Sequence, residues 1–298
     1  MRLACLLMLA FTSVFLLSSC LTTKTIHLES KEGRLIEVSG PPIHKIGLLS
    51  DIHGHLDKLD GFLEQFKSEK VEAVIVSGDS VLNEELSYGR VDKIEDEAEL
   101  EEVLNHLKTA GVPVFVIPGN HEGQGIYKRA WGVKRESVFD LVQYRFVDLK
   151  GLDLVSLPGY YIETDSTHRF LPADGFFLSK EGIQNLSILL RPKEDKDPVM
   201  VITHGPPLSS LETGFDVVQG VGHTGSSVLR KALLDNPISF AIFGHIHEGG
   251  PKAENSTDSI LEGIFSDHLW VNVGAVQDGR ASILEVSGNK ASFTSISD

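Results

Sequence analysis

Five apolar stretches of this sequence end in residue types that bind metal ions, and this repetition constrains the fold more than any other feature. Because residues i and i+2 share a face in an extended backbone, His245 and His247 can reach one point. Open α/β sheets place their sites at the carboxyl ends of their strands. We therefore expect five strand ends to converge. The blocks, in chain order, are Asp51-Ile52-His53, Gly78-Asp79, Gly119-Asn120-His121, His204-Gly205 and Gly244-His245-Ile246-His247.

The spacing of apolar residues between the blocks predicts an α/β domain with mixed sheets. Strand, loop and helix alternate through residues 43–250, with hairpins on both sides. We expect strands at 43–49, 71–76, 112–117, 145–149, 152–157, 199–203, 269–273, 281–286 and 291–296. A further strand begins at residue 238 and leads into the last block. Helices are expected at 56–69, 91–110, 179–190 and 225–234. Thr224, Ser226 or Ser227 would cap the last helix, and we interpret His223 as structural too. The alternative for this N-terminus and for His223 is binding of an anion.

The N-terminal segment has the features of an export signal. Residues 1–19 carry one charge and an apolar run, which is typical of a signal peptide and too short to span a membrane. Leu17 to Cys20 resembles the bacterial lipobox, in which the cysteine is lipidated; an ordinary secretory signal is the alternative. Residues 20–42 would form a short tether and an N-terminal hairpin of strands 26–29 and 35–38, and residues 43–298 the main domain. The sequence thus predicts an exported lipoprotein, anchored in a membrane of the cell envelope.

The charge of the chain limits its partners. The net charge of −15 opposes binding of nucleic acid or of an anionic membrane surface. A basic segment nevertheless follows the third block, and part of it, Lys128 or Arg129, is a candidate contact for substrate phosphate; the alternative is a solvated face. The whole basic segment comprises Lys128, Arg129, Lys134, Arg135 and Arg145.

Seven residues of the blocks are candidate metal ligands: two carboxylates, one amide oxygen and four imidazoles. Seven ligands exceed what one tetrahedral zinc site needs and suit two ions that share a carboxylate. Two ions about 3.5–4 Å apart can activate a bridging hydroxide and neutralise phosphoryl charge during in-line displacement. Mixed oxygen and nitrogen ligation favours manganese, iron or zinc. The seven are Asp51, His53, Asp79, Asn120, His204, His245 and His247.

The order of these blocks resembles that of the calcineurin-like metallophosphoesterases, over residues 43 to about 275. The resemblance implies two mixed β-sheets packed as a sandwich flanked by helices, and two divalent or trivalent ions per chain. One ion would lie on Asp51, His53, Asp79 and His247. The other would lie on Asp79, Asn120, His204 and His245, so that Asp79 bridges the pair.

The same resemblance assigns roles to the residues that follow Asn120. His121 would be the catalytic histidine, which donates a proton to the leaving group or holds the phosphate together with Asn120. Glu122 would orient its neighbours. The segment from Ser80 to Asn83 lacks the Asp-Arg pair that protein Ser/Thr phosphatases carry there, and this argues against protein phosphatase activity.

The function expected from the sequence is hydrolysis of a phosphorylated small molecule or ester, either a phosphomonoester or a phosphodiester. The nucleophile would be a hydroxide that bridges two metal ions. Two alternatives stay open: a catalytically silent binding scaffold on the same fold, and a nuclease. The sequence specifies no oligomeric state.

The lipobox-like segment generates the first prediction. Cys20→Ala removes the thiol that would carry the lipid, so we expect the variant to leave the membrane fraction or to keep its signal uncleaved. Membrane fractionation and mass spectrometry of the N-terminus test this. An unmodified Cys20 in the natural protein, or a mature N-terminus elsewhere, would contradict the expectation.

Overall fold

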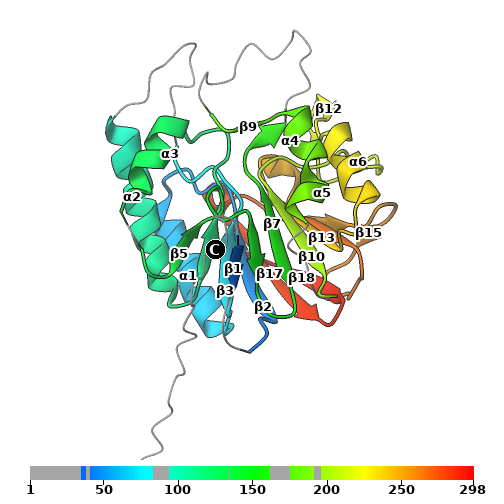
Figure 1. Ribbon diagram of the computed structural model, residues 1–298, viewed down its shortest axis with the longest axis horizontal. Helices are drawn as coiled ribbons and strands as arrows, with labels where there is room; N and C mark the ends of the chain where they lie inside the picture. The colour runs from blue at the N-terminus through cyan, green and yellow to red at the C-terminus, as the bar shows by residue number, and fades with distance from the viewer. Residues whose placement is uncertain (1–34, 38–40, 83–93, 134, 162–174, 191–195) are drawn as a thin grey trace, which may run out of the picture.

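A computed structural model of the chain describes residues 35–37, 41–82, 94–133, 135–161, 175–190 and 196–298. Two mixed β-sheets lie face to face, with helices on their outer surfaces (Figure 1). The fold class expected from the sequence is confirmed. The predicted signal peptide, the lipidation site Cys20 and the first strand of the expected hairpin lie outside the described residues.

The first sheet has six strands and carries the first three blocks. Strands β2 to β5 run parallel, while β17 pairs antiparallel with β2 and with β18. Across the sheet the order is β18 (Lys290–Ser297), β17 (Arg280–Ser287), β2 (Lys45–Leu49), β3 (Ala73–Val76), β4 (Val114–Val116) and β5 (Val138–Asp140).

The second sheet has eight strands and carries the last two blocks. Its centre, β7-β10-β13-β16, is parallel, and antiparallel pairs lie on both sides of it. The order is β1 (Leu35–Glu37), β6 (Phe146–Asp148), β7 (Asp153–Leu157), β10 (Val199–Thr203), β13 (Phe240–Phe243), β16 (Leu269–Asn272), β14 (Lys252–Glu254) and β15 (Ser259–Ile260). Strand β1 pairs with β6, so this sheet begins before residue 43.

The space between the sheets is filled by alternate residues of the central strands. Ile46 and Leu48 of β2 and Ile75 of β3 point into it, because successive side chains of a strand face opposite sides. Met200 and Ile242 meet them from the second sheet. This shared apolar layer holds the two sets of strand ends at a fixed separation.

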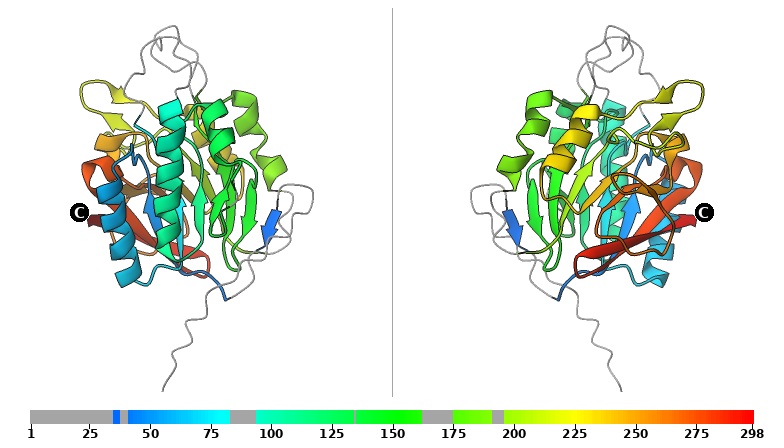
Figure 2. Two further views of the ribbon diagram at one scale, coloured as in Figure 1. Left: turned by 90° about the vertical axis from the view of Figure 1, so that its left-hand side faces the viewer. Right: turned by 90° about the vertical axis from the view of Figure 1, so that its right-hand side faces the viewer.

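Helices cover the outer face of each sheet (Figures 1 and 2). On the six-stranded sheet lie α1 (Leu56–Ser68) and α2 (Ile94–Leu107), the latter extended by a 3-10 turn at Lys108–Ala110. The ring of Phe66 packs so closely on β2 that a Cβ on Gly47 would lie 2.6 Å from it. On the eight-stranded sheet lie α4 (Lys180–Gln184), α5 (Leu186–Leu189) and α6 (Ser227–Asp235).

Several expected elements differ in extent from the observed ones. The helix expected at 179–190 is two short helices, α4 and α5, with a break at Asn185. The last helix begins at Ser227, and the Ser226 hydroxyl accepts a hydrogen bond from the Leu229 N–H, so Ser226 is its cap. Helix α3 (Gln124–Ala130) was not expected. The unexpected strands are β5, the pair β14 and β15, the pair β8 (Tyr160–Tyr161) and β9 (Phe177–Leu178), and the hairpin β11 (Val217–Val218) and β12 (Gly222–His223).

No helix in the described ranges combines the length and the apolar character that crossing a membrane requires.

Candidate metal centre

The seven candidate ligands lie in loops that leave the carboxyl ends of parallel strands. Asp51 and His53 follow β2, Asp79 follows β3 and Asn120 follows β4. In the other sheet, His204 comes directly after β10, and the two histidines of the last block follow β13. Hydrogen bonds join the loops: the Asp51 N–H donates to the Gly78 carbonyl at 3.0 Å, and the Gly244 N–H donates to the His204 carbonyl at 3.0 Å.

Four of the ligands have a backbone conformation that costs free energy. Asp51, His53, Asp79 and His245 have positive φ angles of 52°, 46°, 52° and 67°, and they are four of the six described non-glycine residues with positive φ. Each such residue costs on the order of 1–3 kcal/mol and persists only where its surroundings enforce the conformation. Local hydrogen bonds do so here: the His53 N–H donates to the Asp79 carbonyl at 3.1 Å, and the His245 N–H donates to Asp51 Oδ2 at 3.0 Å.

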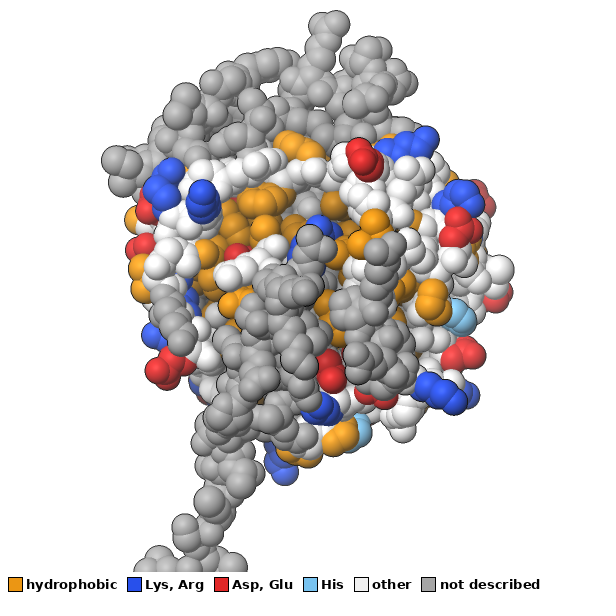
Figure 3. All heavy atoms as spheres, viewed as in Figure 1, with side chains coloured by type: hydrophobic (Ala, Val, Ile, Leu, Met, Phe, Trp, Pro, Cys, Tyr) orange, Lys and Arg blue, Asp and Glu red, His pale blue; other side chains and the backbone are white. Residues whose placement is uncertain are grey.

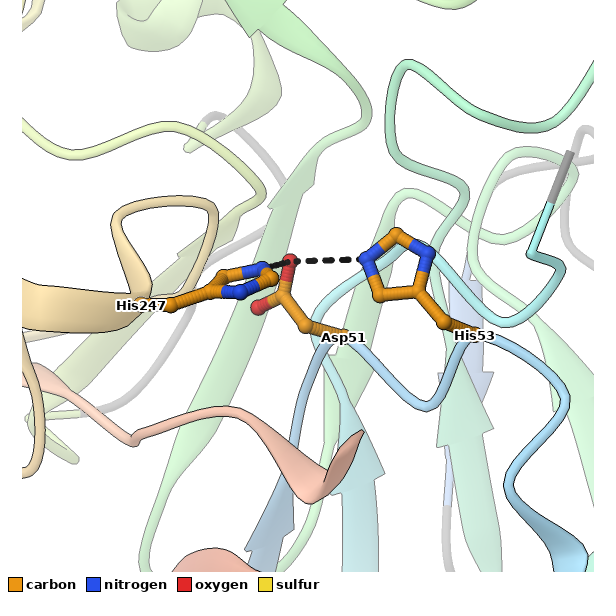
Figure 4. A group of neighbouring side chains, drawn as sticks. All are labelled: Asp51, His53 and His247. Carbon is orange, nitrogen blue, oxygen red and sulfur yellow. Dashed lines mark hydrogen bonds and ion pairs between the residues drawn. The ribbon is translucent and has the colours of Figure 1, made fainter. Parts of the chain in front are cut away.

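One group of ligand atoms consists of Asp51, His53 and His247 (Figure 4). Asp51 Oδ1 lies 3.2 Å from His247 Nε2 and 3.8 Å from His53 Nε2. The two rings approach the carboxylate from opposite sides, one from the loop after β2 and the other from the loop after β13 (Figure 4). This group matches three of the four ligands expected for one ion.

A second group consists of Asp79, His204 and His245. His204 Nε2 lies 3.0 Å from Asp79 Oδ2 and 3.1 Å from His245 Nδ1. The three atoms therefore face one another across a small space. This group matches three of the four ligands expected for the other ion.

Asp79 belongs to the second group and also faces the first. Its Oδ2 is 3.0 Å from His204 Nε2 in the second group and 3.9 Å from His53 Nε2 in the first. It is also 3.8 Å from His121 Nε2, while Asp79 Oδ1 accepts a hydrogen bond from the His121 N–H at 2.9 Å. A single carboxylate oxygen thus faces imidazoles from three different loops.

In two of the candidate ligands, a backbone carbonyl determines which ring nitrogen points into the site. His53 Nδ1 lies 3.1 Å from the Val81 carbonyl and His204 Nδ1 lies 2.9 Å from the Ser77 carbonyl. A carbonyl only accepts hydrogen bonds, so Nδ1 carries the proton in both rings. Nε2 is then the atom that points into the site, an arrangement typical of metal-binding histidines.

The amide of Asn120 also fits a metal ligand. Asn120 is buried, and its Oδ1 has no hydrogen-bond partner among the described residues. A buried polar atom without a partner costs free energy, which a bound cation would recover. The donor set of carboxylate, amide and imidazole atoms therefore fits divalent metal ions.

His121 lies at the edge of the first ligand group. Its Nδ1 lies 3.0 Å from the Leu82 carbonyl, and its ring packs edge-on against the ring of His53, with centroids 4.6 Å apart. The bond to the carbonyl requires a proton on Nδ1. Nε2 therefore faces the site, and it donates a proton only when the ring is the charged imidazolium.

The electrostatics favour ionised carboxylates beside this cluster of rings. Burial opposes the charge of Asp51, but the hydrogen bond from His247 and the charge of His204 outweigh it and lower the pKa of Asp51 to about 2. Burial is likewise outweighed at Asp79, where the charges of His204 and His121 hold the pKa well below its usual value.

The two histidines of the second group differ in their pKa values. Burial lowers the pKa of His204, but the charge and hydrogen bond of Asp79 outweigh burial and raise it to about 9. Burial, together with the charge of His204, lowers the pKa of His245 to about 3. A cation that binds between them would displace the proton from His204.

Three residues beside the ligands support them. The buried carboxylate of Glu122 accepts hydrogen bonds from the Gly119 and Ser80 N–H groups, which agrees with the orienting role expected for it. Sequence reasoning missed the other two. The ring of Tyr160 lies over that of His245 with centroids 4.2 Å apart, and Gln277 Nε2 is 2.7 Å from His247 Nδ1. No spacing rule connects these residues with their partners, which are 85 and 30 positions away.

The basic segment is largely committed to other contacts. Arg135 donates to the Ala130 and Val133 carbonyls, and Arg145 donates to the Ser156 carbonyl. On α3, Arg129 Nε lies 2.6 Å from Glu97 Oε2, and Lys128 is exposed. Basic and acidic side chains are interspersed around the edge of the face in Figure 3. The predicted substrate contact of Lys128 or Arg129 stays a prediction, and Lys134 lies outside the described residues.

The family profile of calcineurin-like phosphoesterases matches residues 44–249. Among solved structures, a dimetal phosphatase from Danio rerio is similar with a TM-score of 0.56 and 16% identity, over 86% of this chain and 99% of that one. A protein of Thermus thermophilus is similar with a TM-score of 0.58 and 14% identity, over 85% and 98% of the two chains. These two similarities establish the fold alone.

One curated relative shares a shorter segment. A probable rhamnogalacturonate lyase C of Emericella nidulans is 29% identical over an alignment of 111 positions that covers 30% of this chain. The match spans only 10% of the length of that relative.

The close packing around Asp79 generates a prediction for Gly119. A Cβ at this position would lie 2.1 Å from Asp79 Oδ1, so Gly119→Ala should displace the carboxylate and weaken metal binding by about 10- to 100-fold. Calorimetric titration with Mn²⁺ measures the change. Gly61→Ala in α1 is the control, because its nearest neighbour is the side chain of Asp298 at 3.1 Å. Wild-type affinity in the Gly119 variant would contradict the assignment of Asp79.

Proposed function

The chain belongs to the calcineurin-like phosphoesterase family, and we propose that it hydrolyses a phosphomonoester or phosphodiester with two metal ions. The observation that supports this most strongly is the position of Asp79 Oδ2, which faces a histidine from each ligand group at 3.0 and 3.9 Å. A carboxylate in this position suits two cations that share one anion. One three-residue group holds Asp79 together with His204 and His245, and another holds it together with His53 and His121.

The residues divide into two sets that would hold one ion each. Asp51, His53 and His247 would hold the first ion and His204, His245 and Asn120 the second, with Asp79 common to both. Bound there, the ions would supply a water nucleophile that ionises near neutral pH, and positive charge toward the phosphoryl oxygens. Manganese, iron and zinc all suit this mixed oxygen and nitrogen set.

His121 is proposed to protonate the leaving group. Its Nε2 faces the site from the rim, since Nδ1 is committed to the Leu82 carbonyl. In an in-line displacement the ester oxygen departs on the side opposite the nucleophile and develops negative charge. An imidazolium there would donate the Nε2 proton to that oxygen, and the neutral ring would regain it from water. The Asn120 amide lies next to it in the chain and is proposed to contact the phosphate.

The cellular setting is also a proposal. The apolar N-terminal segment and the lipobox-like end at Cys20 support an exported protein that is held at a membrane by a lipid. The acidic composition disfavours long polyanions as substrates. A phosphorylated small molecule or ester therefore fits better than DNA or RNA.

The proposed role of His121 is tested with two leaving groups. An alkoxide needs a proton to depart, whereas a nitrophenolate is stable as an anion. We expect His121→Gln to lower kcat on an alkyl phosphate by at least about 100-fold and on nitrophenyl phosphate by less than about tenfold. Metal content should stay at the wild-type value.

The matched control is His106→Gln, which removes a histidine on α2 that pairs with Asp60. Its kcat on both substrates should equal that of the wild type. Equal losses on the two substrates in the His121 variant would mean that this residue only positions the phosphate or supports the ligands.

A further inference from the structure

The hairpin β11–β12 holds a histidine that the proposed mechanism does not use. His223 Nδ1 lies 2.9 Å from Oδ1 of Asp216, whose side chain is fully buried, while the His223 side chain is 36% exposed. The other oxygen, Oδ2, accepts a hydrogen bond from the Gly225 N–H at 3.1 Å. The buried carboxylate thus fixes the orientation of a ring that reaches solvent.

This hairpin is attached to the loop that begins with the ligand His204. Ser226 N–H donates to the Pro206 carbonyl and Leu208 N–H to the Ser226 carbonyl, both at 3.0 Å. The two backbone segments pack so closely here that a Cβ on Gly225 would lie 2.3 Å from the Pro207 carbonyl oxygen. The position of the hairpin is therefore tied to one of the ligand loops.

The hairpin is also attached to the loop of His247. The buried amide of Asn272 donates to the Phe215 carbonyl at 3.1 Å and to the Ile246 carbonyl at 2.9 Å, so one side chain joins both segments. Cα atoms of β11 lie within 8 Å of those of the turn His247–Gly249. His223 lies opposite Val217 in the hairpin, which puts its Cα no more than about 14 Å from this turn.

We infer that His223 binds the substrate through Nε2, at the rim of the metal centre beyond the scissile phosphate. This inference rests on the proposed phosphoesterase function. An ionised carboxylate only accepts hydrogen bonds, so the proton of the neutral ring is on Nδ1 and Nε2 is an acceptor. The carboxylate of Asp216 directly behind the ring disfavours a second phosphate at this position, since like charges repel. The group it would bind is a hydrogen-bond donor, a hydroxyl or amine, on the alcohol part of the ester.

Two esters with the same carbon chain test this contact: glycerol phosphate and propyl phosphate, each as the monoester and as its methyl diester. They differ by two hydroxyl groups. We expect the wild type to have the higher kcat/KM on glycerol phosphate, through a lower KM. One neutral hydrogen bond accounts for a preference of about threefold to tenfold.

Two substitutions separate binding from a structural role. In His223→Asn the Nδ2 amide stands where Nδ1 stood, so the bond to Asp216 can persist while Nε2 is lost. We expect this variant to lose the preference for glycerol phosphate and keep the wild-type melting temperature. In His223→Gln a polar atom stands near the position of Nε2, but the bond to Asp216 is lost. This variant should keep part of the preference and melt at a lower temperature.

The control is His268→Asn, which changes an exposed histidine near the start of β16 and should leave the preference unchanged. If His223→Asn retains the wild-type preference, or if the wild type has none, the assignment of His223 as a substrate-binding residue is wrong. Hydrolysis of neither ester by the wild type would instead contradict the proposed function on which it rests.

Discussion

The arrangement of this protein depends on one buried carboxylate that several loops surround. Asp79 Oδ2 faces ring nitrogens of His53, His121 and His204 at distances of 3.0 to 3.9 Å. The preceding residue, Gly78, is closely packed: a Cβ there would lie 2.6 Å from His204 Nδ1 and 2.8 Å from the backbone nitrogen of Gly119, and Gly78 has a φ of 109°. Carboxylate, glycines and histidines therefore form one unit in which each part limits the conformation of the others.

The two-sheet core provides the rigidity that this unit needs. The ligands come from both sheets, so their separation is set by the apolar layer between the sheets and not by any single loop. Strained residues such as Asp51 and His245 persist because neighbouring strands and their hydrogen bonds enforce the conformation. Such preorganisation lets the polar atoms meet a cation without a further rearrangement of the backbone.

Sequence reasoning predicted the strands that lead into the ligand loops, and the loops themselves, because both signals are local. An apolar run that ends in Gly-His-Ile-His specifies a buried strand followed by a loop with two imidazoles. The extended backbone expected from His245 to His247 was wrong, because His245 has a φ of 67° and His247 begins a 3-10 turn. The two rings therefore belong to different ligand groups and do not meet at one point. The stacking of Tyr160 on His245, the contact of Gln277 with His247 and the pairing of Asp216 with His223 carry no such pattern. They result from the way separate loops meet in the folded chain. The same holds for Arg135, which counts as a free charge in the sequence but donates to carbonyls of its own segment.

The central claim is that two metal ions share Asp79. The most direct test is to measure the number of metal ions that each chain retains in the Asp79→Asn variant and to compare it with the number in His247→Asn. After exposure to excess Mn²⁺ and removal of free metal, the wild type should hold two ions per chain. His247→Asn should lose affinity for one ion only, because its ring belongs to one ligand group. Asp79→Asn should lose more, since without the shared anion two cations would face each other uncompensated. Two tightly held ions per chain in Asp79→Asn would contradict the claim.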